Sequence, residues 1–171
     1  MFHKTTKLVF AAVLFILGVW QFTESNYGNG IFLFILIALP IFLYFRNEYI
    51  LLAFLRLRKQ DFPGAKVWLD KIKNPDTALV RKQQGYYNYL NGLMVSQTNL
   101  IQAEKFFKKA IELGLNMDMD LAVAKLNLAG IALSRRRKME ATQLLNETKK
   151  LDKHNMLKEQ IGMMKEQLKR I

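Results

Sequence analysis

The sequence predicts an all-α protein with two parts, a two-helix transmembrane hairpin in residues 1–45 and a domain of paired helices in residues 46–171. Three observations favour this division. Residues 8–22 and 31–45 are almost entirely apolar, whereas the rest of the chain is mixed and charged. The second part carries +11 of the total net charge of +12. It also repeats itself with a period of 38 residues.

Composition excludes several kinds of chemistry. The chain has no Cys, which rules out disulfides, thiolate metal sites and a cysteine nucleophile. Its two histidines, His3 and His154, do not make a His-rich zinc site on their own. A His-x-x-x-His pair, a Gly-rich phosphate loop and a Gly-x-Ser-x-Gly elbow are also missing from the sequence. We therefore expect no enzyme activity, no metal and no cofactor.

The two apolar runs predict the membrane hairpin. Each run spans 15 residues, about 22 Å as a helix, which is shorter than a hydrocarbon core of about 30 Å. Flanking residues extend the predicted helices to about 7–25 and 27–46, where the long side chains of Lys7 and Arg46 can reach the polar interface. The polar stretch 23–30 contains two glycines and is typical of a tight reversal.

Each apolar run has an alternative interpretation. Two lysines precede the first run, as in a signal peptide, but no small-x-small cleavage site follows it. The second run could form a buried core helix, although its apolar residues leave no face for water.

The distribution of basic residues predicts the orientation in the membrane. Lys4 and Lys7 precede the first span, the loop between the spans has no Lys or Arg, and the segment after the second span contains Arg56, Arg58 and Lys59. The positive-inside tendency then places both termini in the cytoplasm, in a bacterial-type plasma or inner membrane.

The second part consists of three similar units. Within each unit, apolar residues at helical spacing form one helix, a polar turn follows, and a second apolar pattern forms another helix. Two columns define the register of the second helices: Ala65, Ala103 and Ala141, and four residues later Leu69, Phe107 and Leu145.

These units resemble the tetratricopeptide repeat family over about residues 46–152. The residues that carry the resemblance in the best-matching unit are Tyr87, Leu90, Gly92, Ala103, Phe107 and Ala110. The period differs, being 38 residues here against 34 in the family. The resemblance implies an α-solenoid of about three helix pairs that binds a protein partner in a groove lined by the first helix of each unit.

The resemblance also implies which residues line that groove. The residues carried over by position are Asn88, Gly92, Val95, Ser96, Val123, Leu126, Asn127, Gly130 and Ser134. Gly92 and Gly130 have two interpretations, close approach of a partner's backbone or close packing of one helix on the next. Of the Lys, Arg and Asn set with which chaperone-binding members clamp a carboxylate, only Asn127 is present, so that ligand is not expected.

A further amphipathic helix is expected at about residues 154–171. Its apolar residues recur at steps of three or four, with basic residues opposite. We interpret it as the cap that covers the last repeat. A partner-binding amphipathic helix has the same pattern and is the alternative.

The C-terminal part contains two clusters of like charge, one acidic and one basic. Asp118 and Asp120 precede an apolar stretch, so we read them as helix-capping residues rather than as an acid–base or metal pair. Arg135, Arg136, Arg137 and Lys138 form a predicted basic patch.

The junction near Arg46 has no Gly or Pro and so predicts that the second span continues directly into the first repeat helix.

Together these features predict a membrane-anchored adaptor or scaffold that holds a protein partner in a membrane complex and has no catalysis or small-molecule substrate of its own. The alternative is a basic cytoplasmic tether for nucleic acid, a ribosome or anionic lipid, because the second part is so strongly positive.

Overall fold

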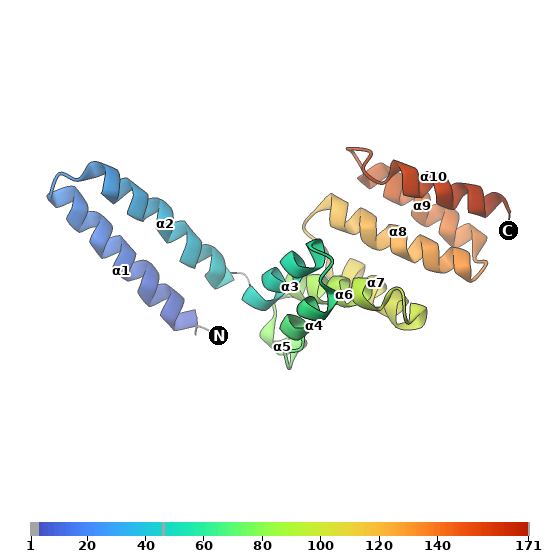
Figure 1. The fold of residues 1–171 in the computed structure, drawn as a ribbon, viewed down its shortest axis with the longest axis horizontal. Helices are drawn as coiled ribbons and strands as arrows, with labels where there is room; N and C mark the ends of the chain where they lie inside the picture. Colours follow the sequence, from blue (N-terminus) through green and yellow to red (C-terminus); the bar gives the residue numbers. More distant parts are fainter. Residues whose placement is uncertain (1–3, 46, 171) are drawn as a thin grey trace. The chain divides into compact units, whose positions relative to one another are not determined.

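The computed structural model describes residues 4–45 and 47–170, which contain ten α-helices and no strand (Figure 1). The all-α prediction is therefore confirmed. The chain divides into two compact units, Met1–Leu51 and Leu52–Ile171, whereas the sequence analysis divides it after residue 45. Expectations for His3, Arg46, Ile171 and the Lys4 side chain fall outside the described residues and side chains.

In the N-terminal unit, α1 (Lys4–Thr23) and α2 (Tyr27–Phe45) pack as an antiparallel helical hairpin (Figure 1). Aromatic side chains join the two helices. The ring of Phe34 lies 5.5 Å from that of Phe15 and 5.7 Å from that of Phe22. At Gly30, an added Cβ would lie 2.6 Å from the Phe22 ring, so the glycine allows this close approach. The predicted turn is thus held by aromatic packing.

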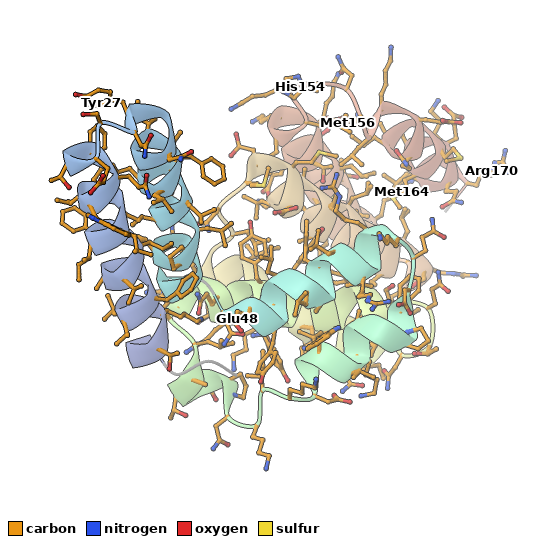
Figure 2. The ribbon with its side chains drawn as sticks, turned by 60° about the vertical axis from the view of Figure 1, so that its left-hand side comes forward. Tyr27, Glu48, His154, Met156, Met164 and Arg170 are labelled. Carbon is orange, nitrogen blue, oxygen red and sulfur yellow. The ribbon has the colours of Figure 1, made fainter. Side chains whose placement is uncertain are left out.

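Large apolar side chains cover the outside of both hairpin helices, and Figure 2 shows the side chains projecting from the two ribbons. In α1 the exposed ones are Leu8, Val9, Phe10, Val13, Phe15, Ile16, Leu17, Val19 and Trp20; in α2 they are Tyr27, Ile31, Phe32, Ile35, Leu39 and Ile41. By length and composition, Thr6–Thr23 is able to cross a membrane, and Tyr27–Ile41 is a shorter apolar helix.

The junction after the hairpin differs from the expectation of one continuous helix. Helix α2 ends at Phe45, and a separate helix, α3 (Glu48–Arg58), begins after Asn47. The Tyr49 N–H donates to Asn47 Oδ1 at 3.0 Å, so Asn47 caps the start of α3. Asn is a strong helix-capping residue, which is why the chain breaks here without Gly or Pro. An ion pair joins Glu48 to Lys7 of α1.

The C-terminal unit consists mainly of antiparallel helix pairs. Helices α6 and α7 pack closely, as do α8 and α9, while α7 contacts α8 and α10 lies against both α8 and α9. The bounds are α4 (Phe62–Leu69), α5 (Pro75–Ala78), α6 (Arg81–Val95), α7 (Leu100–Leu113), α8 (Asp118–Ser134), α9 (Lys138–Leu151) and α10 (Lys158–Lys169). The short helix α5 is not anticipated by the sequence analysis. The expected capping helix is present but begins four residues later, at Lys158.

The 38-residue register is visible in the hydrogen bonds of the turns. Ala65, Ala103 and Ala141 each donate a backbone N–H to the carbonyl four residues earlier, at 3.0, 2.9 and 3.0 Å. The turns before α4 and α9 match more closely still, since Gln60 and Arg136 both have a positive φ, of 59° and 57°.

The same register organises the core. Ala65, Ala103 and Ala141 are fully buried, as are their partners Leu69, Phe107 and Leu145. In the α6–α7 and α8–α9 pairs the small alanine lets the second helix approach the first, and the large residue one turn later fills the space between them. After α9, the Asp152 carboxylate fixes the turn that leads into α10, because it accepts hydrogen bonds from the backbone N–H groups of Met156 and Leu157.

Candidate partner-binding surface

The four candidates on α6 occupy different environments. Asn88 is buried, and its side-chain amide donates to the Gln84 carbonyl of its own helix at 2.8 Å. Gly92 is buried too, whereas Val95 and Ser96 are half-buried near the end of the helix. The Ser96 hydroxyl donates to the Leu93 carbonyl. Asn88 and Ser96 thus donate their side-chain hydrogen bonds to carbonyls of their own helix.

Gly92 serves helix packing. A Cβ at this position would lie 2.9 Å from Cε1 of Phe107, whose side chain is fully buried on α7. The close-packing interpretation therefore describes Gly92 in this structure. Gly85, which no sequence pattern distinguishes, is more constrained: a Cβ added there would lie 2.4 Å from the carbonyl oxygen of Gly114.

On α8, two candidates face the protein core. Leu126 is buried in a cluster formed by α8, α9 and α10, and Val123 packs against that cluster. Neither residue presents a free side chain to a partner. The remaining polar candidates bond to their own helix, with Asn127 donating to the Val123 carbonyl and Ser134 to that of Ile131.

Helix α10 lies over Gly130, the remaining candidate residue on α8. A Cβ added at Gly130 would meet Cε of Met164 at 3.4 Å (Figure 2). Leu157, Ile161 and Leu168, in or just before α10, complete the cluster that contains Leu126. In this structure α10 thus takes the position on α8 that the sequence analysis assigns to a partner.

A buried hydrogen bond links the starts of α6 and α8. The Tyr86 hydroxyl donates to Asp120 Oδ2 at 2.7 Å and accepts the Asn116 N–H at 3.3 Å. Burial, and next the bond to Asp120, raise the pKa of Tyr86 to about 12. Asp118, by contrast, is exposed and forms an ion pair with Lys153 at 2.6 Å. The two carboxylates thus have separate structural partners and do not form a paired site.

Half of the predicted basic patch is engaged in an ion-pair network. Glu104, buried on α7, accepts hydrogen bonds from Arg135 at 2.8 Å and Arg137 at 3.0 Å across the interface between helix pairs. Lys108 bonds the same carboxylate at 2.8 Å. The bonds from Lys108 and then from Arg137 lower the pKa of Glu104 to about 2 against the effect of its burial.

Arg136 and Lys138 are the other half of this patch. Both are exposed, and among the described residues neither forms an ion pair. Sequence reasoning misses the bonds from Arg135 and Arg137 to Glu104, because these residues lie 31 and 33 positions after Glu104, outside any local spacing rule.

Two features of the described residues bear on ligand binding. The described residues contain no group of three or more His, Asp or Glu side chains that could hold a metal ion. A shallow hollow of about 600 Å³ follows α9 alone. Its lining consists of Met139, Glu140, Thr142, Gln143, Asn146, Glu147 and Lys150. Because one helix supplies every lining residue, no second element directs a side chain into it.

Comparison with known proteins gives no relative: no family model matches the chain, and neither the curated proteins nor the solved structures contain a significant match.

Proposed function

We propose that the protein is a membrane-anchored adaptor, in which α1 and α2 both cross the bilayer and the paired helices of the C-terminal unit hold a protein partner. The observation that carries the anchor is the exposed apolar surface of the hairpin, which extends over both helices. Contiguous apolar surface on this scale marks a membrane or protein contact, because exposing it to water is unfavourable.

The lengths of the two helices are compatible with two spans. Helix α1 has 20 residues and α2 has 19, so each extends about 30 Å, the thickness of the hydrocarbon core. Their polar turn, from Glu24 to Asn26, reaches the far interface in this arrangement. The Lys7–Glu48 ion pair lies at the opposite end of the hairpin, where charges are compatible with the near interface.

The repeated helix pairs support the adaptor role. Stacked pairs with one register create an extended surface, and such repeat domains commonly recognise proteins. The resemblance to tetratricopeptide repeats favours a peptide or helix as the partner. Leu126 is buried under α10, and Val123 and Gly130 pack against the same region, so the accessible part of the proposed surface comprises Val95, Ser96, Asn127 and Ser134.

Membrane extraction and cysteine labelling test the anchor. We expect the chain to stay in the pellet after alkaline extraction. Because the chain has no native Cys, Asn29→Cys and Met156→Cys give single labelling sites. An impermeant maleimide added to intact cells should label Asn29→Cys and should reach Met156→Cys only after lysis. Labelling of Met156→Cys in intact cells contradicts the cytoplasmic placement.

Photocrosslinking tests the adaptor role. A photoreactive residue at Val95 or Ser134 should capture one defined protein, while the same residue at Lys149, exposed on α9, serves as the matched control. Capture should persist between about 50 and 200 mM salt, whereas a nucleic-acid tether would lose its ligand over this range. Equal capture at Val95 and Lys149 contradicts the proposal.

A further inference from the structure

Exposed apolar side chains recur at the start of the second helix in each pair. Ile101 is 62% exposed and Met139 is 86% exposed, and these positions are spaced by the 38-residue period. Pro63, one period before Ile101, is exposed as well. Phe62 and Leu100, the first residues of α4 and α7, are 40% and 41% exposed. We call Phe62, Pro63, Leu100, Ile101 and Met139 the apolar row.

The position of this row in the helices determines where it projects. All its members are the first or second residues of α4, α7 or α9. Side chains on a helix lean toward its N-terminus, so side chains in the first turn extend past the helix start toward the preceding turn. In Figure 1 the turns before α7 and α9 lie on the same side of the C-terminal unit. Leu100, Ile101 and Met139 therefore lie along the edge formed by these two turns, and Phe62 and Pro63 have the equivalent position at the start of α4.

The unpaired charges along this edge are positive, because its carboxylates form ion pairs with basic residues of the same chain. Its carboxylates are each bonded to a cation: Asp61 to Arg56, Glu140 to Arg137, and Glu104 to three basic residues. Lys59 lies in the turn before α4, Arg136 lies in the turn before α9, and Lys138 is the first residue of α9; none of the three forms an ion pair among the described residues. Apolar side chains and uncompensated cations thus occur together at one edge.

We propose that this edge docks on the surface of an anionic bilayer, with the apolar row entering the headgroup region and Lys59, Arg136 and Lys138 contacting lipid phosphates. A combination of apolar insertion and basic contacts is how peripheral segments bind anionic membranes. The apolar residues are separate protrusions over three turns, which fits a broad flat surface better than a peptide that needs a continuous groove. The proposal rests on the proposed membrane anchor only for keeping a bilayer within reach.

Site-specific fluorescence in the full-length chain tests this proposal. Four single-cysteine variants carry an environment-sensitive fluorophore: Ile101→Cys and Met139→Cys in the row, Met163→Cys as an exposed apolar control on α10, and Phe32→Cys in the hairpin. Each is reconstituted in vesicles containing a headgroup-region nitroxide lipid. The vesicles are either wholly zwitterionic or contain about 30 mol% phosphatidylglycerol.

We expect the Ile101 and Met139 probes to shift to shorter wavelength and to be quenched about threefold more in anionic than in zwitterionic vesicles. The Met163 probe should respond equally weakly in both. Quenching at Met139 should fall to the Met163 level in the double variant Arg136→Glu/Lys138→Glu but persist in the matched variant Lys149→Glu/Lys150→Glu. Raising the salt to about 500 mM should reduce it reversibly in the parent chain, a readout independent of whether the double variant folds.

The other outcomes overturn the proposal. Row probes that match Met163 in anionic vesicles show that the edge does not contact lipid. A wavelength shift without nitroxide quenching indicates a protein surface instead, and self-quenching between labelled chains indicates a second copy. The Phe32 probe separates the two proposals: if it is quenched while the row is not, the anchor stands and only the docking edge fails, whereas an unquenched Phe32 contradicts the anchor itself.

Discussion

The two units treat their apolar side chains in opposite ways. In the hairpin, residues such as Phe32 and Ile35 are exposed on the helix surfaces, and the buried positions include Leu14, Gly18, Gly30 and Pro40. In the C-terminal unit, residues such as Phe107 are fully buried. The C-terminal unit buries its apolar side chains within itself, whereas in the proposed function the hairpin buries them in the bilayer. The difference teaches that exposure has to be interpreted with the solvent in mind.

The largest effect that this comparison predicts comes from emptying the core of the C-terminal unit. Phe107→Ala should destabilise that unit by about 3–5 kcal/mol, because it removes the side chain that fills the α6–α7 interface. Phe32→Ala is the matched control in the hairpin and should change the unfolding free energy by less than about 0.5 kcal/mol. Urea unfolding in micelles, followed by circular dichroism, measures both. Equal effects of the two variants would remove the distinction between the units.

The next effect comes from two glycines that sequence reasoning does not separate. Gly85→Ala should cost about 2–3 kcal/mol, because its Cβ would lie 2.4 Å from the Gly114 carbonyl and the backbone has to move. Gly130→Ala should be neutral or stabilise the helix by up to about 1 kcal/mol, because its only close neighbour is the flexible end of Met164. Thermal unfolding of both variants measures the difference. A larger loss at Gly130 would show that α10 packs more rigidly than its contacts indicate.

The glycines also show how far sequence reasoning reaches. Local sequence patterns are sufficient to predict the helical class, the turn between α1 and α2 and the last helix, α10, because these depend on neighbouring residues. They do not decide whether Gly92 lines a partner-binding groove or allows two helices to pack closely, since the answer depends on Phe107 in a different helix.

The candidate surface was less predictable for the same reason. Leu126 and Gly130 have the positions of groove residues, but α10 covers them through contacts that no spacing within α8 encodes. The capping of α3 by Asn47 depends on one side-chain hydrogen bond, and the apolar run that ends before it gives no sign of where the helix breaks.

A smaller effect concerns pH and the interface between the helix pairs. Because the pKa of Glu104 falls from 4.5 to about 2 on folding, its stabilisation is complete above about pH 4.5 and is lost as the pH falls toward 2. Glu104→Gln should cost about 1.5 kcal/mol at neutral pH and flatten the pH dependence of unfolding in that window. Glu112→Gln, on the exposed face of the same helix, is the control. An unchanged pH profile in Glu104→Gln would mean that the Glu104 carboxylate is not the source of the pH dependence in that window.

The smallest predicted effect concerns the side-chain cap at the start of α7. The side chain of Asn99 accepts the Gln102 N–H at 3.0 Å and so satisfies one of the free donors at the start of α7. Asn99→Ala should therefore cost about 1 kcal/mol, whereas Asn99→Asp should restore the parent stability because Asp caps helices equally well. Gln97→Ala, exposed in the same turn, measures the background effect of truncation. Thermal unfolding distinguishes these variants, and a loss in Asn99→Asp as large as in Asn99→Ala would assign the role of Asn99 to something other than capping. If Asn99→Ala loses no more stability than Gln97→Ala, water alone satisfies the free N–H groups at the start of α7, as it does at an exposed helix end without a cap.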